Sequence, residues 1–213
     1  RSMGVPTFLG GACRGLLGKN SPYHISQNRG AALKESDCVI LAGAYADFRL
    51  QYGASLPNRG KIISINRNAE KLNLNSSIYW SPTLLSQGDP CHFLIELAQT
   101  INTNGKYSKW CGFLKEKQLK KDQLNKRKGD EPAVGRWNYK GGEPLVNPIK
   151  LLTEVDRLLP PNTILVADGG DFVGTAANVL KPTGPLAWLD PGAYGTLGVG
   201  AGFALGVKLA VPS

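Results

Sequence analysis

A turn of two glycines between two acidic residues is the segment best suited to chemistry. The run Asp168-Gly169-Gly170-Asp171 follows the apolar stretch 163–167 and precedes a predicted helix. Glycines at the carboxyl end of a strand let backbone amides approach an anion, and the following helix points its positive N-terminal dipole to the same place. A tight strand-to-helix turn with one glycine at positive φ explains the same residues equally well. The residues alone therefore leave an anion site and a structural turn both open.

A second glycine-rich segment lies further along the chain, at Ala193-Tyr194-Gly195-Thr196-Leu197-Gly198. A bulky apolar Leu197 between glycines, at the start of a helix of small residues, is suited to lie under a planar ligand. The alternative is close packing of a glycine-rich helix against a sheet. That alternative is our interpretation of the three glycines that follow, Gly200, Gly202 and Gly206.

Common catalytic, nucleotide and metal motifs are absent from the sequence. It contains no GxGxxG, GxxxxGK or GxSxG pattern. The cysteines form no CxxC pair, and the two histidines stand apart from any metal-ligand spacing. These residues are Cys13, Cys38, Cys91, Cys111, His24 and His92. We therefore expect no structural zinc site, and free thiols in a reducing compartment.

The elements that must position these segments alternate between helix and strand. In the first third, a helix is predicted over 27–36, buried strands over 37–43 and 61–66, and a helix from Asp89-Pro90 to about 100. After Asn147-Pro148 we predict a helix to 159, a strand over 163–167, a helix from about 172 to 180, a short strand over 187–189 and a closing glycine- and alanine-rich helix. Buried strands separated by helices indicate parallel sheets and an α/β fold.

Charge and composition limit the remaining possibilities. The net charge is +9, and residues 106–128 hold nine Lys or Arg against Glu116 and Asp122. Their ragged apolar stripe favours a basic surface helix over a contact with nucleic acid, an acidic membrane or an acidic partner domain. Residues 129–146, rich in glycine and proline, predict a linker. The composition, with 42% hydrophobic residues, excludes a disordered chain, a coiled coil and collagen, and no secretory signal or membrane helix is evident.

Several motifs together resemble one enzyme family. The stretches 164–177 (ILVADGGDFVGTAA) and 189–209 (LDPGAYGTLGVGAGFALGVKL) resemble the start of the diphosphate-binding domain of thiamine-diphosphate enzymes in the acetolactate synthase group. The runs GVPTFLGG (4–11), RGLLG (14–18) and LAGAYADFRL (41–50) resemble the central domain of that family. The motifs occur in the family's order, and the similarity covers nearly the whole chain except about 106–146.

The resemblance implies an α/β protein of more than one domain. A Rossmann-like central domain with a parallel sheet, truncated at its N-terminus, would occupy 1–105. A basic helix and linker would occupy 106–146, and the start of a diphosphate-binding α/β domain, truncated at its C-terminus, would occupy 147–213. Because the last segment offers only about two strands, too few for an independent sheet, we expect the chain to be a piece of a longer protein.

The resemblance also assigns cofactor-binding residues. In the family, the turn matching Gly169, Gly170, Asp171 and Phe172 contacts the diphosphate of thiamine diphosphate. The carbonyl matching Gly195 accepts a hydrogen bond from the aminopyrimidine, and the residue matching Leu197 supports the bent form of the cofactor, with Thr196 between them. The catalytic glutamate and the Mg²⁺ ligands of the family are expected outside this chain, which contains no Gly-Asp-Gly.

Relatives can hold FAD or ADP in the central domain without using it in the reaction. The positions that match are Gly43, Ala44, Asn66 and Asp89. Asn66 stands where relatives often have an acidic residue that binds ribose hydroxyls. A structural relic that binds no nucleotide is the alternative.

The implied activity is that of a lyase or carboligase acting on 2-hydroxyacyl-CoA or 2-oxo acids. An inactive regulatory paralogue and a nucleotide-binding module without thiamine chemistry are the alternatives. The implied partners are a small-molecule substrate and the pyrimidine-binding domain of a partner subunit, in a homodimer or homotetramer, with no nucleic acid. The implied location is intracellular, at the endoplasmic reticulum membrane through an anchor outside this segment, which itself would not contact the membrane.

Overall fold

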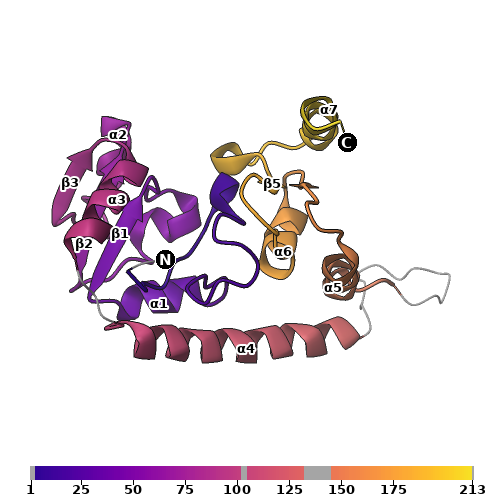
Figure 1. The fold of residues 1–213 in the computed structure, drawn as a ribbon, viewed down its shortest axis with the longest axis horizontal. Coiled ribbons are helices and arrows are strands. Elements are labelled where there is room, and N and C mark those ends of the chain that lie inside the picture. Colours follow the sequence, from indigo (N-terminus) through magenta and orange to yellow (C-terminus); the bar gives the residue numbers. More distant parts are fainter. Residues whose placement is uncertain (1–2, 102–104, 132–144, 213) are drawn as a thin grey trace. The chain divides into compact units, whose positions relative to one another are not determined.

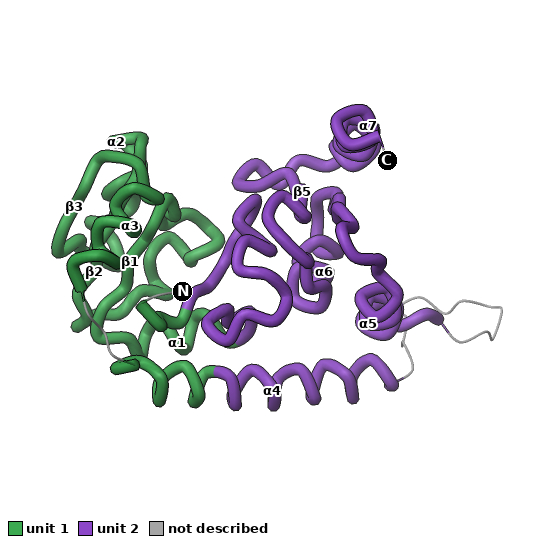
Figure 2. Tube along the Cα trace, in the orientation of Figure 1, with its two compact units in different colours: residues 1–6, 28–114 green, residues 7–27, 115–213 purple. Residues whose placement is uncertain are grey.

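The structure, a computed structural model, describes residues 3–101, 105–131 and 145–212. The chain forms two compact units: residues 1–6 with 28–114, and residues 7–27 with 115–213 (Figure 2). This division differs from the expected segments, since residues 7–27 pack with the C-terminal part of the chain. The expected family boundaries at 105 and 146 remain a prediction, and most of the predicted linker 129–146 lies outside the described residues.

Unit 1 contains a three-stranded parallel sheet in the order β1-β2-β3 (Figure 1). Its strands are β1 (Cys38–Ala42), β2 (Lys61–Asn66) and β3 (Leu84–Gln87), and Ile40 of β1 pairs with Ile63 of β2. The helices are α1 (Arg29–Glu35), α2 (Ala69–Leu72) and α3 (Pro90–Thr100), with a 3-10 segment at Phe48–Gly53. The predicted parallel sheet is confirmed, and β3 is an additional strand that sequence analysis missed.

The core of unit 1 forms where inward residues of β1 and β2 meet the segment that follows β1. Its buried side chains are Val39, Leu41, Ala46, Leu50, Leu56, Ile62 and Trp80. Alternate residues of β1 point into this core, as expected for a strand whose side chains alternate between two faces. Asp89 caps the helix α3, which follows β3. Its carboxylate accepts hydrogen bonds from the N–H groups of Cys91 and His92 at the start of the helix.

The described residues of unit 2 form a short two-stranded parallel sheet, three complete helices and the larger part of a fourth, at 108–130, which begins in unit 1. The strands are β4 (Leu165–Val166) and β5 (Trp188–Leu189). The helices are α5 (Pro148–Leu158), α6 (Asp171–Val179) and α7 (Gly200–Ala210), with 3-10 turns at Gly11–Cys13 and Gly192–Tyr194. Leu152, Ala176 and Trp188 form its buried core. Each predicted helix and strand of this part of the chain is present, and the mixed α/β fold with parallel sheets is confirmed.

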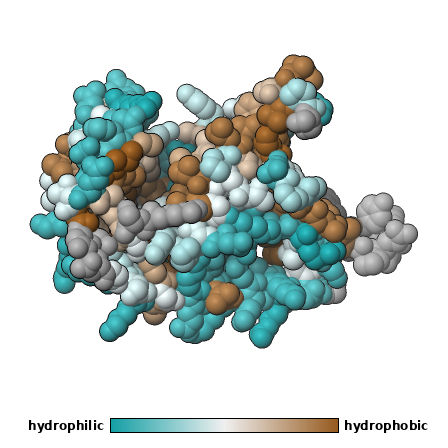
Figure 3. Space-filling view, in the orientation of Figure 1, coloured by the Kyte–Doolittle hydropathy of each residue, from teal (hydrophilic) through white to brown (hydrophobic). Residues whose placement is uncertain are grey.

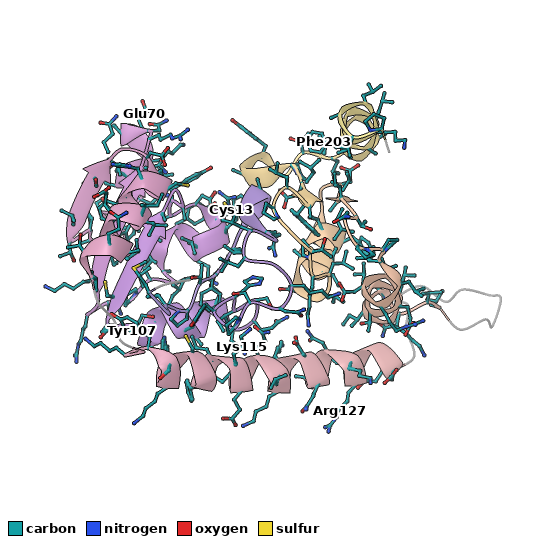
Figure 4. The ribbon with its side chains drawn as sticks, viewed as in Figure 1. Cys13, Glu70, Tyr107, Lys115, Arg127 and Phe203 are labelled. Atoms are coloured by element: carbon teal, nitrogen blue, oxygen red, sulfur yellow. The ribbon has the colours of Figure 1, made fainter. Side chains whose placement is uncertain are left out.

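A long helix, α4 (Ser108–Asp130), carries the excess positive charge. One side of it packs inward: Lys115 Nζ donates to the carbonyl oxygens of Ser21 (3.2 Å) and His24 (2.6 Å), and Gln118 Oε1 accepts from the N–H of Ser26. Figure 4 shows Lys115 and Arg127 on different sides of this helix. The predicted basic surface helix is therefore present. Within the described residues, no helix combines the length and the apolar character needed to cross a membrane.

Candidate functional site

Two loops of unit 2 meet beyond the carboxyl ends of β4 and β5. One is the double-glycine turn after β4, and the other is the loop between β5 and α7. A Cβ added to Gly169 would lie 2.7 Å from the carbonyl oxygen of Thr196 and 2.8 Å from that of Gly195. Real Cβ atoms do not approach backbone oxygen so closely, so position 169 has room only for glycine. The structure therefore brings together the two segments that the sequence singled out.

The carboxylate of Asp168 ties the two loops to each other. Its Oδ1 accepts hydrogen bonds from the N–H groups of Gly169 (2.7 Å) and Gly198 (2.9 Å), and its Oδ2 accepts one from Gly200 (3.3 Å). These backbone donors, with Gly169 first, lower the pKa of Asp168 below its usual value. Sequence analysis placed Asp168 at the turn but missed its hydrogen bonds to the second loop, because Gly198 and Gly200 lie about thirty residues away and leave no local signal.

The double-glycine turn leads directly into the N-terminus of α6. Gly170 has a φ of +87° and precedes Asp171, the first residue of the helix, and it contributes no side-chain cap. The first N–H groups of an α-helix have no partner within the helix, so an uncapped start can receive an anion. The positive φ also satisfies the structural interpretation of this turn. Phe172, the next predicted site residue, is exposed at the same helix start.

A buried tryptophan positions the second loop. Trp188, in β5, is 1% exposed and donates a hydrogen bond from Nε1 to Asp190 Oδ2 at 2.8 Å. The other oxygen of Asp190 accepts the N–H of Gly192 at 2.9 Å, which fixes the turn after the strand. The chain then passes through Gly195, with a φ of +60°, and reaches Leu197.

Leu197 lies over the double-glycine turn with most of its surface open. Its Cδ2 atom would lie 3.0 Å from a Cβ added to Gly169 and 3.5 Å from a Cβ added to Gly170. The side chain is 70% exposed. Leu197 offers an apolar surface beside the uncapped start of α6, which suits an apolar ring with an anionic group attached. The residues present therefore fit thiamine diphosphate.

The same C-terminal region exposes further apolar surface. Tyr194 is 92% exposed beside the loop, and Leu205 and Leu209 are exposed on α7. Figure 3 shows hydrophobic residues gathered over α7. Among the residues that the structure describes, no three His, Cys, Asp or Glu side chains gather as a metal-binding group.

An arginine from the N-terminal segment contacts the end of α6 and the ring of Trp188. Arg14 Nη1 donates to the carbonyl of Ala177 at 3.0 Å, and its guanidinium lies 5.5 Å from the centre of the Trp188 ring. The adjacent Gly15 packs directly against the carbonyl of Gly184, so a side chain there would clash. These contacts lie within unit 2, and the assignment of the run 14–18 to the family's central domain stays a prediction.

The predicted nucleotide positions gather at the carboxyl edge of the sheet in unit 1. The N–H of Gly43 donates to Ile65 O at 2.8 Å, and Asn66 Nδ2 donates to Gly43 O at 3.2 Å. Asn66 is buried, whereas Ala44 is exposed. Asp89 forms an ion pair with Arg67, which is the main cause of its lowered pKa. The edge thus uses the Asn66 amide and the Asp89 carboxylate in its own hydrogen bonds.

Comparison with known proteins gives a family match and close curated relatives. Residues 168–213 match the model of the thiamine pyrophosphate enzyme C-terminal TPP-binding domain. The chain is 51% identical over 211 residues to 2-hydroxyacyl-CoA lyase 2 of Danio rerio and 49% identical to that of Homo sapiens, covering 99% of this chain and 32% of each relative. It is 27% identical to a probable acetolactate synthase of Mycobacterium bovis, covering 98% of this chain and 35% of that protein.

Solved structures agree on the fold. A thiamine diphosphate-dependent 4-hydroxybenzoylformate decarboxylase of Rhodococcus jostii superposes with a TM-score of 0.60 at 15% identity, over 99% of this chain and 36% of that one. The resemblance to thiamine-diphosphate-dependent enzymes is therefore confirmed. The chain spans about a third of the length of the curated relatives it matches.

Proposed function

We propose that this chain is part of a thiamine-diphosphate-dependent enzyme that cleaves 2-hydroxyacyl-CoA. Two relatives at 51% and 49% identity carry the name 2-hydroxyacyl-CoA lyase 2, and the match covers 99% of the chain. Joining of 2-oxo acids is the second candidate, supported by the 27% identity to a probable acetolactate synthase. The inactive paralogue and the plain nucleotide-binding module have no comparable support.

The observation that carries the assignment of a cofactor site is the close approach of Gly169 to the carbonyl oxygens of Gly195 and Thr196. We assign Gly169, Gly170, Asp171 and Phe172 to the diphosphate, because Gly170, Asp171 and Phe172 lie at an uncapped helix start and Gly169 leaves the turn before it without a side chain. The carbonyl of Gly195 would accept a hydrogen bond from the aminopyrimidine amino group.

Leu197 would bear the cofactor on its exposed isobutyl group, and Thr196 would hold the backbone between the two contacts. Thiamine diphosphate supplies the electron sink for breaking the carbon–carbon bond. The residues of this chain bind and orient it. The proposal assigns the catalytic glutamate and the Mg²⁺ ligands to other parts of the full-length protein.

The remaining expectations stay proposals of the same kind. Gly43, Ala44, Asn66 and Asp89 would line a nucleotide site for FAD or ADP, against which stands the use of Asn66 and Asp89 within the sheet edge. A pyrimidine-binding domain from a second subunit would complete the cofactor site in a homodimer or homotetramer. The location would be intracellular, at the endoplasmic reticulum membrane.

A matched pair of glycine variants tests the assignment in the full-length protein. Gly169→Ala places a Cβ against two carbonyl oxygens and must push the loops apart, whereas Gly174→Ala, inside α6, meets nothing within 4 Å. We expect Gly169→Ala to weaken thiamine diphosphate binding in calorimetric titrations with Mg²⁺, and Gly174→Ala to leave it unchanged. Equal affinity of both variants would remove the double-glycine turn from the cofactor site.

The choice between the two activities is tested by substrate. Purified full-length protein with thiamine diphosphate and Mg²⁺ is given a 2-hydroxyacyl-CoA in one assay and a 2-oxo acid in another. In the first assay we expect the 2-hydroxyacyl-CoA to be cleaved into a shortened aldehyde and formyl-CoA. Product formation only from the 2-oxo acid would favour the carboligase.

A further inference from the structure

A small pocket lies in unit 2, lined by residues of the helices α4, α5 and α6. It has a volume of about 210 Å³. Its walls come from the helices α4, α5 and α6 and from Gln27. The lining residues are Gln27, Lys121, Asn125, Ile149, Thr175, Asn178 and Val179. It is smaller than the roughly 300–1,000 Å³ of typical small-molecule sites, so its size suits a compact molecule.

Lys121 gives this pocket its charge. It is partly buried on α4, and no hydrogen bond or ion pair joins it to any residue that the structure describes. The neighbouring Asp122 is directed to Lys181, at 3.7 Å, and no carboxylate lines the pocket. A lysine that lines a pocket without a carboxylate favours an anionic ligand.

Neutral polar residues line the same pocket as Lys121, of which Asn125 is partly buried and Asn178 exposed. The side-chain amides of Asn125 and Asn178 have no hydrogen-bond partner within the described part of the chain and line the same cavity. Gln27 is buried, and its Nε2 donates to the carbonyl of Asn178 at 2.9 Å, which fixes its side chain at the wall. Two amide groups can donate N–H bonds to an oxyanion that Lys121 neutralises.

The rest of the wall consists of Thr175, whose hydroxyl donates to the carbonyl of Asp171 at 3.5 Å, and two aliphatic residues. Ile149 is the second residue of α5, and Val179 is the last residue of α6. Together with the single positive charge, this surface matches a ligand with one negative charge and a short hydrocarbon part. A phosphate dianion would leave the aliphatic wall uncovered and one charge unpaired.

We propose that this pocket binds a small monocarboxylate with a short aliphatic chain. The carboxylate would lie at Lys121 between the amides of Asn125 and Asn178, and the chain would lie against Ile149 and Val179. The site is separate from the cofactor residues: Asn178 lies at the far end of α6 from Gly170, seven residues beyond Asp171. The proposal does not depend on the proposed function.

Calorimetric titration of the full-length protein with butyrate tests the proposal, with thiamine diphosphate and Mg²⁺ present throughout. Butyrate is expected to bind in the millimolar range, and its neutral isostere butyramide is not. Loss of the charge in Lys121→Gln should weaken butyrate binding by about tenfold, since a charge-assisted hydrogen bond is lost. Lys121→Arg, which keeps the charge, should retain binding.

The matched control is Lys126→Gln, which makes the same change of charge at an exposed position of the same helix. It should leave the affinity unchanged. Asn178→Asp places a carboxylate in the pocket and should abolish binding by repulsion, so two independent variants report on the site. Thermal midpoints confirm that each variant is folded.

Three results would overturn the proposal. The first is absence of butyrate binding at millimolar concentrations. The second is binding that survives both Lys121→Gln and Asn178→Asp, which would place butyrate elsewhere, such as the catalytic centre. The third is tighter binding of inorganic phosphate than of butyrate, which would make this a phosphate site.

Discussion

Asp168 accepts a hydrogen bond of 2.9 Å from the backbone N–H of Gly198, thirty residues further along the chain. The same carboxylate accepts the N–H groups of Gly169 and Gly200. One side chain therefore holds the turn after β4 against the loop before α7. The cofactor residues that we assign lie on both sides of this connection, so their spacing depends on the charge of Asp168.

The first prediction concerns that charge. Because backbone donors lower the pKa of Asp168, its contribution to stability is complete above the unfolded value of about 3.9 and is lost as the pH falls through the lower folded value. Asp168→Ala should lower the hydrogen-exchange protection of the Gly198 and Gly200 amides at neutral pH. Wild-type protection should persist to below about pH 4. Unchanged protection in the variant would show that the carboxylate is not the tie.

The second prediction separates the binding and packing roles of Leu197. Since the side chain is 70% exposed, Leu197→Ala should change the free energy of unfolding by less than about 0.5 kcal/mol. If Leu197 supports the cofactor, the variant should lose turnover by about a hundredfold per cofactor-loaded site, because a misplacement of about 1 Å has that effect.

Leu197→Met, of similar volume, serves as the control and should be tolerated. Turnover of the full-length protein is measured beside its thermal midpoint. A loaded Leu197→Ala protein with normal turnover would exclude a role for Leu197 in orienting the cofactor.

The third prediction uses His24. Burial, followed by the charges of Lys115, Arg14 and Lys181, lowers the pKa of His24 from 6.5. The unfolded chain therefore takes up a proton as the pH falls below about 6.5 while the folded chain does not, and stability decreases. The stability of the folded chain is therefore unaffected by His24 above about pH 6.5.

His24→Gln should reduce this decrease in the thermal midpoint between about pH 6.5 and 5. His92→Gln is the matched control, since His92 is exposed on α3. Parallel midpoint curves for wild type and His24→Gln would contradict the assignment of this pH dependence to His24.

The fourth prediction concerns the core of unit 1. Gly53 has a φ of +101°, and an added Cβ would overlap the indole of Trp80. Gly53→Ala should therefore cost roughly 2–4 kcal/mol of unfolding free energy from backbone strain and overpacking together. Gly30→Ala, inside α1 with nothing within 4 Å, should be neutral or stabilising by up to about 1 kcal/mol. Denaturant titration of both variants measures the difference, and equal midpoints would count against this packing.

The sequence alone was sufficient for elements with a strong local pattern. The runs 37–43 and 61–66 are apolar and end in a glycine or a polar residue, and they became β1 and β2. Asn147-Pro148 and Asp89-Pro90 combine a cap with a first-turn proline, and they begin α5 and α3. The residues that we propose for the cofactor could be singled out because the motifs around Gly169 and Gly195 are themselves local.

The strand β3 shows where local pattern fails. Leu84-Leu85-Ser86-Gln87 is short, does not alternate, and is largely exposed, so nothing in it separates strand from loop. It becomes a strand only because β2 offers it backbone partners, from Ile63 to Asn66.

Tertiary structure alone decided how distant segments meet. The sequence contains Asp168, Gly198 and Gly200 but does not show that one carboxylate joins them. It also contains Arg14, whose contacts with Ala177 and the Trp188 ring place residues 7–27 in unit 2. Local propensities act over a few residues, whereas these contacts depend on where the whole chain brings side chains together in space.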